Sequence, residues 1–106
     1  MIAANMINAT VRQYREHGWI LRRIVLNSAD SADIASDFEV DVEIGAPVNG
    51  MWFSRPPQPG GEVWELRYLG ATQFALVEQM DETEPDFLAR LRSVEERLAA
   101  IVAARE

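Results

Sequence analysis

The sequence predicts an α+β fold in which an antiparallel sheet of four to five strands is flanked by an N-terminal and a C-terminal helix. Two patterns carry this prediction. The segments at the two ends repeat their apolar residues at the three-to-four spacing of a helix. Between them lie short stretches rich in β-branched and aromatic residues, separated by glycines and prolines. A chain of 106 residues has the length of one domain, and we expect residues 1–106 to form a single α+β domain.

The two predicted helices are recognised by their stripes and by their ends. The first runs from Ile2 to about Glu16 and is closed by Gly18, the residue type that most often follows a helix. The second begins with Thr83 as N-cap and has Pro85 in its first turn. Its apolar stripe contains Phe87, Leu88, Leu91, Val94, Leu98, Ile101 and Val102.

The first two predicted strands differ in their polarity. Trp19 to Leu26 is apolar on both faces, which predicts a strand that is covered on both sides. Residues 27–36 are small and polar and predict a loop with room for one helical turn. The next segment alternates strictly between apolar and acidic residues, which predicts a half-buried strand with an anionic outer face. Its apolar residues are Phe38, Val40, Val42 and Ile44, and its acidic residues are Asp37, Glu39, Asp41 and Glu43.

Residues 51–55 and 62–69 are predicted to pair around the loop from Pro56 to Gly61. Symmetric pairing about this loop sets Phe53 opposite Trp64 on a core face. The face on the other side then carries Trp52, Val63, Glu65, Arg67, Ala75 and Val77. A three-residue turn, residues 70–72, leads to the last strand and pairs Tyr68 with Phe74. We prefer it to a two-residue turn, which would send Phe74 to the other face.

Charge and composition weaken several classes of function. All 10 basic residues are arginines, they face 17 carboxylates, and the formal net charge is −7. Such a chain repels phosphate backbones and anionic bilayers, so we expect neither a nucleic acid nor a membrane as partner. The sequence has no cysteine, which removes disulfides and thiolate metal sites. No signal peptide is recognisable, and we expect a cytoplasmic protein.

The sequence leans against an enzyme without excluding one. His17 is the only histidine, and it directly precedes Gly18, where a surface histidine at a helix end is the plainer interpretation. Serines occur in no nucleophile motif. The four carboxylates from Asp37 to Glu43 would be spread along a strand, which gathers ligands poorly around an ion. We therefore expect no metal and no cofactor.

Two surfaces remain as candidates for function. The row Asp37, Glu39, Asp41 and Glu43 is either a solvated face, partly neutralised by arginines on a neighbouring strand, or a docking stripe for a basic partner. The face that carries Trp52, Glu65 and Arg67 is either covered by a helix of the same chain or exposed as an interface.

Our leading hypothesis is a non-catalytic protein-interaction module that forms a homodimer or binds a basic partner protein through these surfaces. The alternative is a small-ligand-binding domain. Its pocket would lie between sheet and helix and combine an arginine with aromatic side chains chosen among Trp19, Trp52, Trp64 and Tyr68.

Overall fold

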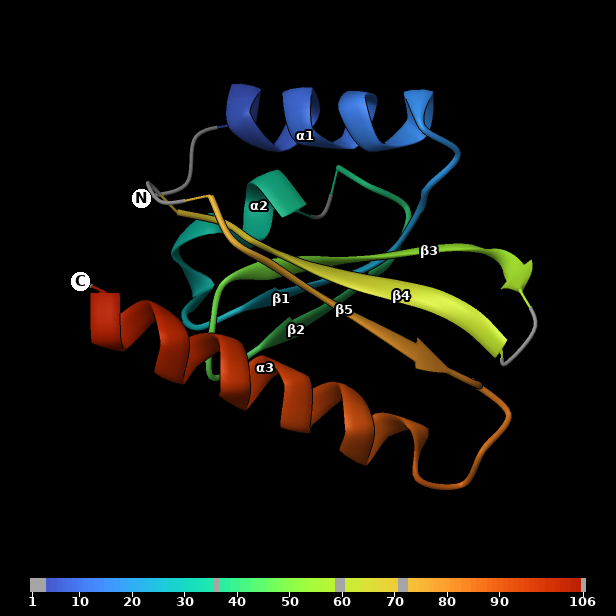
Figure 1. Cartoon of the computed structure of the whole chain (residues 1–106). Helices are drawn as coiled ribbons and strands as arrows, with labels where there is room; N and C mark the ends of the chain where they lie inside the picture. The colour runs from blue at the N-terminus through green and yellow to red at the C-terminus, as the bar shows by residue number, and fades with distance from the viewer. Residues whose placement is uncertain (1–3, 36, 59–60, 71–72, 106) are drawn as a thin grey trace.

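A five-stranded sheet separates two helices that lie on its opposite faces (Figure 1). The computed structural model describes residues 4–35, 37–58, 61–70 and 73–105. The predicted class is confirmed: an N-terminal helix, a mostly antiparallel sheet and a C-terminal helix follow one another along the chain. The elements are α1 (Ala4–Glu16), β1 (Ile20–Leu26), a 3-10 turn (Ala29–Ser31), α2 (Ala32–Ala35), β2 (Asp41–Ile44), β3 (Gly50–Gln58), β4 (Gly61–Tyr68), β5 (Ala75–Met80) and α3 (Phe87–Arg105).

The strands are arranged in the order β2-β1-β3-β4-β5, so that β2 and β5 form the two edges. Four neighbouring strands pair antiparallel, but β1 and β2 run parallel, with Arg23 next to Asp41. Parallel neighbours need a crossover connection, and residues 27–40, with the 3-10 turn and α2, supply it. The sequence predicts the strand but not this direction.

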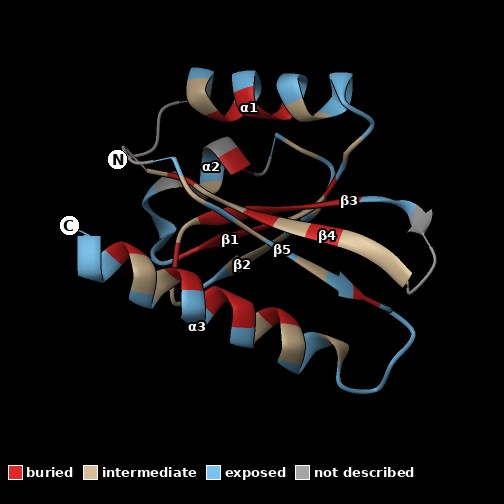
Figure 2. Cartoon of the chain, in the orientation of Figure 1, coloured by how far each residue is buried: buried red, intermediate tan, exposed pale blue. Residues whose placement is uncertain are grey.

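Each face of the sheet has its own apolar core (Figure 2). β1 contributes to both, because Ile24 packs in the α1 core and Val25 in the α3 core, as expected for a strand covered on both sides. The α1 core contains Ile7, Val11, Leu21, Ile24, Leu26, Ala35, Met51, Phe53 and Leu69. The α3 core contains Val25, Ala46, Val48, Trp52, Trp64, Leu66, Met80, Leu91, Val94, Leu98 and Val102.

The predicted register of β3 and β4 is wrong by one residue. Trp52 pairs with Leu66, and Ser54 rather than Phe53 pairs with Trp64. The cause is a shift in register between Arg55 and Gln58, which symmetric pairing about the loop does not anticipate. A slip of one residue exchanges the two faces. Trp52 therefore points into the α3 core, where it is 0% exposed.

A second irregularity lies in β1, between Leu21 and Arg23, opposite Phe53 and Trp52 of β3. The extra residue is Arg22, and it lets two consecutive arginines face α3. Arg22 lies over the Trp64 ring at 4.7 Å and bonds Glu82 at 2.6 Å. Arg23 reaches Glu43 on β2 at 3.3 Å.

The structure confirms some of the predicted helix ends and turns and contradicts others. Gly18 closes α1 with a φ of +84°, and the amide of Tyr68 donates to the carbonyl of Phe74 (2.8 Å), which confirms the β4–β5 register. Ile2 and turn residues 71 and 72 lie outside the described part of the chain. Thr83 does not cap α3, because its amide and hydroxyl both donate to the Asp81 carboxylate, and the helix begins at Phe87.

The acidic segment is a strand only over its second half. β2 covers Asp41–Ile44, and the amide of Val40 donates to the carbonyl of Phe38 (2.7 Å), which curls the backbone before the strand begins. Phe38, Val40 and Val42 still pack against the α1 core. The predicted alternation of packed and exposed side chains therefore holds from Asp37 to Val42, but it fails at Ile44, which was predicted on the apolar face and is 45% exposed.

Candidate functional site

The α1 face of the sheet is covered over one half and open over the other. Helix α1 packs on β1 and β3, where Met51 and Phe53 are fully buried. Beyond it, β4 and β5 present a row of five side chains that we call the open half-face. These are Val63, Glu65, Arg67, Ala75 and Val77, and the register sets Glu65 opposite Val77 and Arg67 opposite Ala75. Both sequence alternatives for this face, a helical cover and exposure, therefore apply to different halves of it.

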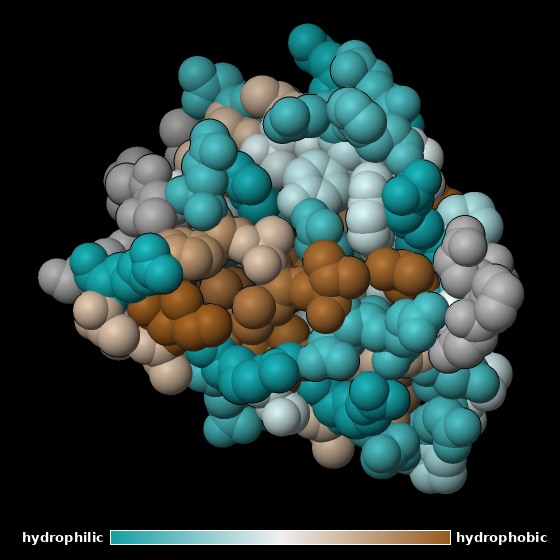
Figure 3. Space-filling model, in the orientation of Figure 1, coloured by the Kyte–Doolittle hydropathy of each residue, from teal (hydrophilic) through white to brown (hydrophobic). Residues whose placement is uncertain are grey.

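Strand β5 adds an edge to this open half-face. It pairs with β4 on one side, and no other strand in the described residues pairs with it. Val77 is 56% exposed, and Ala75 is exposed as well. Figure 3 shows apolar surface across the middle of the molecule, between α1 and α3, where Figure 1 places β5.

The backbone of β5 presents hydrogen-bonding groups outward. Residues that exchange hydrogen bonds alternate along an antiparallel pair, and Tyr68 with Phe74 is such a pair. Leu76 and Glu78 therefore direct their N–H and C=O groups to β4, whereas Ala75, Val77 and Gln79 direct theirs away from it. At the end of the strand, the Gln79 carbonyl accepts a bond from Arg90 (3.3 Å).

A polar cluster links the open half-face to α1. The Tyr14 ring stacks on Phe53 with centroids 4.0 Å apart, and its hydroxyl donates to the Glu65 carboxylate. Burial, followed by the bond and charge of Glu65, raises the pKa of Tyr14 well above its usual value, against the opposing influence of Arg67. A pocket of about 270 Å³ lies here, lined by Gln13, Tyr14, His17, Trp19, Glu65 and Arg67. Glu65 and Arg67 thus do lie together, as predicted.

Trp52 does not belong to this face, and its predicted place beside Glu65 and Arg67 is wrong. Its indole Nε1 instead donates to Glu95 Oε2 at 2.9 Å, deep in the α3 core. Glu95 is 1% exposed and was missed at the sequence level. The signal was present, because Glu95 lies four residues after Leu91 and three before Leu98, on the buried side of α3.

The predicted acidic residues lie at the opposite edge of the sheet from β5, around β2, and are not one row. Asp37, Glu39 and Asp41 are exposed. Glu43 is half-buried and accepts bonds from Arg23 (3.3 Å) and Arg92 (2.8 Å). The expected neutralisation by an arginine of a neighbouring strand therefore occurs at Glu43. The structure does not bring these residues together with Glu65 and Arg67.

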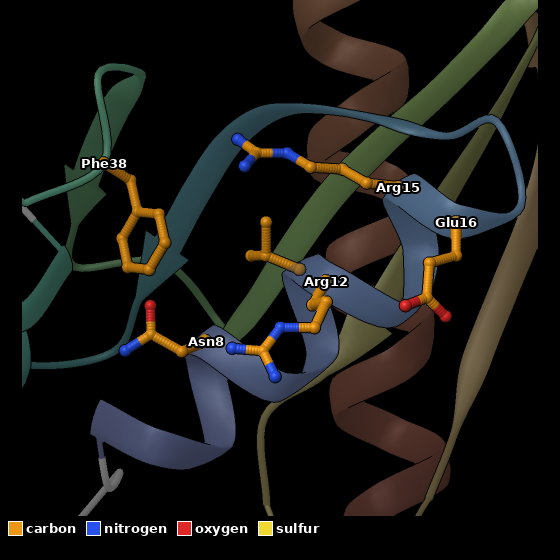
Figure 4. Close-up of a pocket in the computed structure, with 6 residues that line it drawn as sticks. Asn8, Arg12, Arg15, Glu16 and Phe38 are labelled. Atoms are coloured by element: carbon orange, nitrogen blue, oxygen red, sulfur yellow. The ribbon is translucent and has the colours of Figure 1, made fainter.

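A wider hollow of about 410 Å³ lies between α1 and the segment before β2 (Figure 4). Asn8, Arg12, Arg15 and Glu16 come from α1, and Phe38 comes from the segment before β2. The four α1 side chains are exposed and Phe38 is half-buried. Since charged side chains on a helix surface are normally solvated, this hollow indicates no particular ligand.

The described residues include few candidates for a catalytic or metal-binding site. His17 is exposed, with its Nδ1 2.9 Å from the Gln13 carbonyl at the end of α1. Within the described ranges, no three histidine, aspartate or glutamate side chains are grouped so that they could hold a metal ion. None of the described helices is both long and apolar enough to cross a membrane.

Comparisons with models of protein families, with curated proteins and with solved structures find no match to this chain.

Proposed function

We propose that this protein is a self-associating module that forms a homodimer by pairing β5 of one copy with β5 of a second. The observation that carries the proposal is the exposed, uncharged outer row of an edge strand. Ala75, Val77 and Gln79 direct both their side chains to the open half-face and their backbone groups away from β4. An edge of this kind is a template for another strand.

The two edges of the sheet differ in the way this proposal requires. Natural edge strands are protected by being short or by carrying charges. β2 fits that description, because it has four residues, two of which are Asp41 and Glu43. β5 has six residues, and its one charged side chain, Glu78, points to the other face and forms an ion pair with Arg97 on α3.

The hydrogen-bonding pattern favours one symmetric register. A two-fold axis at Val77 pairs Val77 with Val77 of the second copy and Ala75 with Gln79, all residues whose backbone groups face outward. The Val77 pair at the axis contributes two backbone hydrogen bonds, and an Ala75–Gln79 pair flanks it on either side. An axis at Leu76 makes fewer such pairs, and an axis at Glu78 sets two carboxylates directly opposite each other, which is unfavourable.

Side chains are compatible with this register on both faces. On the open half-face, Val77 meets Val77 and Ala75 meets Gln79, so no charges oppose each other. On the α3 side, Glu78 meets Leu76 of the second copy while Arg97 of its own chain compensates its charge.

Sedimentation velocity on two matched variants tests the proposal. Val77→Arg sets two like charges, one from each copy, directly opposite each other at the two-fold axis. It is expected to convert the dimer to a monomer. Ile44→Arg is the control, because Ile44 is also β-branched, 45% exposed and on an edge strand, but on β2. We expect wild type and Ile44→Arg to sediment increasingly as dimers between roughly 10 and 300 μM, the range of a weak interface.

Two results would contradict the proposal. One is a wild-type chain that remains monomeric over that whole concentration range. The other is a dimer that Val77→Arg leaves intact and Ile44→Arg dissociates, because that pattern would assign the interface to β2.

A further inference from the structure

The pocket of about 270 Å³ between α1 and β4 contains two side chains of opposite charge, Glu65 and Arg67. They lie two residues apart on β4 and share a face of the sheet, so their Cα atoms are about 6.8 Å apart. Both side chains are half-buried and line the pocket, where a ligand can contact them. One chain forms the whole pocket without β5, so ligand binding can be tested apart from the proposed dimer contact.

The sheet supplies neither of these charges with a cross-strand partner of opposite sign. Their four neighbours on β3 and β5 are all apolar. These neighbours are Met51, Phe53, Ala75 and Val77. Among residues 4–35, 37–58, 61–70 and 73–105, neither Glu65 nor Arg67 takes part in an ion pair. A half-buried charge has lost part of its hydration, so a ligand that provides a charge-assisted hydrogen bond is stabilised there.

The Tyr14 hydroxyl brings the two charges close to one point. It donates to Oε2 of Glu65. Burial and Glu65 raise the pKa of Tyr14, and the charge and hydrogen bonding of Arg67 oppose them, so the guanidinium also lies at this hydroxyl. The other oxygen of Glu65, Oε1, accepts no hydrogen bond from the described residues, and a guanidinium has five N–H donors. An anionic acceptor and a cationic donor therefore lie side by side in the pocket.

The other lining residues add an acceptor and an aromatic surface. Nδ1 of His17 is 2.9 Å from the Gln13 carbonyl. A carbonyl oxygen only accepts, so Nδ1 carries the hydrogen, and Nε2 of the neutral ring is left as an acceptor. The half-buried Trp19 ring contributes apolar area to the same pocket.

These charges disfavour a ligand that carries a single charge. An anion that pairs with Arg67 also meets the Glu65 carboxylate, and a cation that pairs with Glu65 also meets the guanidinium. A zwitterion satisfies both side chains. Because its net charge is zero, it is also not repelled by the protein's net charge of −7.

We propose that this pocket binds a free α-amino acid with an apolar side chain. Its carboxylate accepts from the guanidinium of Arg67, its ammonium group donates to Oε1 of Glu65, and its side chain lies against the Trp19 ring. The volume suits a molecule of this size, because it lies at the small end of the range for ligand pockets.

Titration with three matched probes tests this assignment on the wild-type protein. The probes are L-leucine, 4-methylpentanoate, which lacks the ammonium group, and 3-methylbutylamine, which lacks the carboxylate. The readout is the NMR signal of the Trp19 indole N–H, and the indoles of Trp52 and Trp64 in the α3 core serve as internal references. We expect leucine to shift the Trp19 signal saturably at millimolar concentration. Each truncated probe should bind about tenfold more weakly, because it has lost one charge-assisted contact.

Two variants assign each end of the ligand to its partner. With Arg67→Gln, leucine should bind about tenfold more weakly and lose its advantage over 3-methylbutylamine. With Glu65→Gln, it should lose its advantage over 4-methylpentanoate, while the glutamine oxygen can still accept from Tyr14. Arg15→Gln and Glu16→Gln are the controls, because they remove the same charges from exposed positions of α1 outside this pocket and should leave leucine binding unchanged.

Three results would overturn the proposal. The first is that no probe moves the Trp19 signal. The second is that a truncated probe binds the wild type as tightly as leucine does, which would show that the pocket recognises a single charge. The third is that the folded Arg67→Gln and Glu65→Gln variants keep both preferences of the wild type. Should either variant not fold, the comparison of the three probes on the wild type still decides.

Discussion

Glu95 is a carboxylate placed among the apolar side chains of α3, and its neighbours determine how it titrates. Burial is the largest influence and raises its pKa above the usual 4.5; the bond from Trp52 opposes this, the nearby Glu43 adds to it, and the arginines Arg92 and Arg23 lower it. The folded protein therefore binds the Glu95 proton more tightly than the unfolded chain does. The resulting stabilisation is fully present below pH 4.5 and is lost as pH rises through the raised pKa.

This sign gives a pH-dependent prediction for Glu95→Gln. The variant stays neutral and can keep an oxygen for the Trp52 indole, so its free energy of unfolding relative to wild type should increase as pH rises from about 4 to about 8. Urea denaturation at several pH values measures the difference. Glu96→Gln is the control, since that side chain is exposed and should show no comparable trend. A difference between Glu95→Gln and wild type that is the same at every pH would contradict the prediction.

Gly18 carries a prediction about the backbone. Its φ of +84° lies in the left-handed region, which side chains with a Cβ rarely adopt. Gly18→Ala should lower the free energy of unfolding by about 1 kcal/mol, and Gly18→Asn should lose less because asparagine tolerates this conformation better. Thermal or urea unfolding of both variants checks the order. If alanine proves no worse than asparagine, the end of α1 is not held as described.

At the scale of elements, α3 shows that a residue in the predicted apolar stripe of a helix need not be buried. The predicted stripe contains Leu98, which is 0% exposed, and also Leu88, which lies in the first turn of α3 and is 67% exposed. Leu98→Ala should lower the free energy of unfolding by about 2–5 kcal/mol, and Leu88→Ala by less than about 0.5 kcal/mol. Equal losses in chemical denaturation would mean that Leu88 packs more tightly than the structure indicates.

The strand pairings show what a sequence can and cannot predict about registers. The β4–β5 register was predictable, because only one turn length keeps Tyr68, Phe74, Leu66 and Leu76 on one face. The β3–β4 register was not, because a shift between Arg55 and Gln58 depends on backbone packing that leaves no local pattern. That single residue moved Trp52 from the predicted outer surface into the core.

The same distinction between local pattern and tertiary packing applies to the candidate surfaces. Val63, Glu65, Arg67, Ala75 and Val77 share a face as predicted, because alternation along β4 and β5 is local information. How far α1 extends across that face is a tertiary property, and the sequence could only pose it as two alternatives. The ion pairs of Glu43 with Arg23 and Arg92 require a bulge in β1 and a helix that packs from the far end of the chain, so no contiguous motif in the sequence predicts them.

At the scale of the whole molecule, the net charge of −7 opposes association of like copies. Salt screens such repulsion over about 8 Å at 0.15 M and about 3 Å at 1 M, whereas backbone pairing and valine contacts are insensitive to it. The dimer should therefore become more stable as sodium chloride increases, which sedimentation at fixed protein concentration measures. A dimer that dissociates on adding salt would instead point to an interface formed by ion pairs, such as the acidic residues around β2 with arginines of the second copy.

The most direct test of β5 pairing is amide hydrogen exchange followed at increasing protein concentration. The amides of Ala75 and Val77 point away from β4, and those of Leu76 and Glu78 point toward it, so each strand carries its own internal control. We predict that exchange of the Ala75 and Val77 amides slows as the concentration rises, while the two inner amides change little, and that Val77→Arg abolishes the slowing at Ala75. Exchange at Ala75 and Val77 that is independent of concentration would contradict self-association through β5.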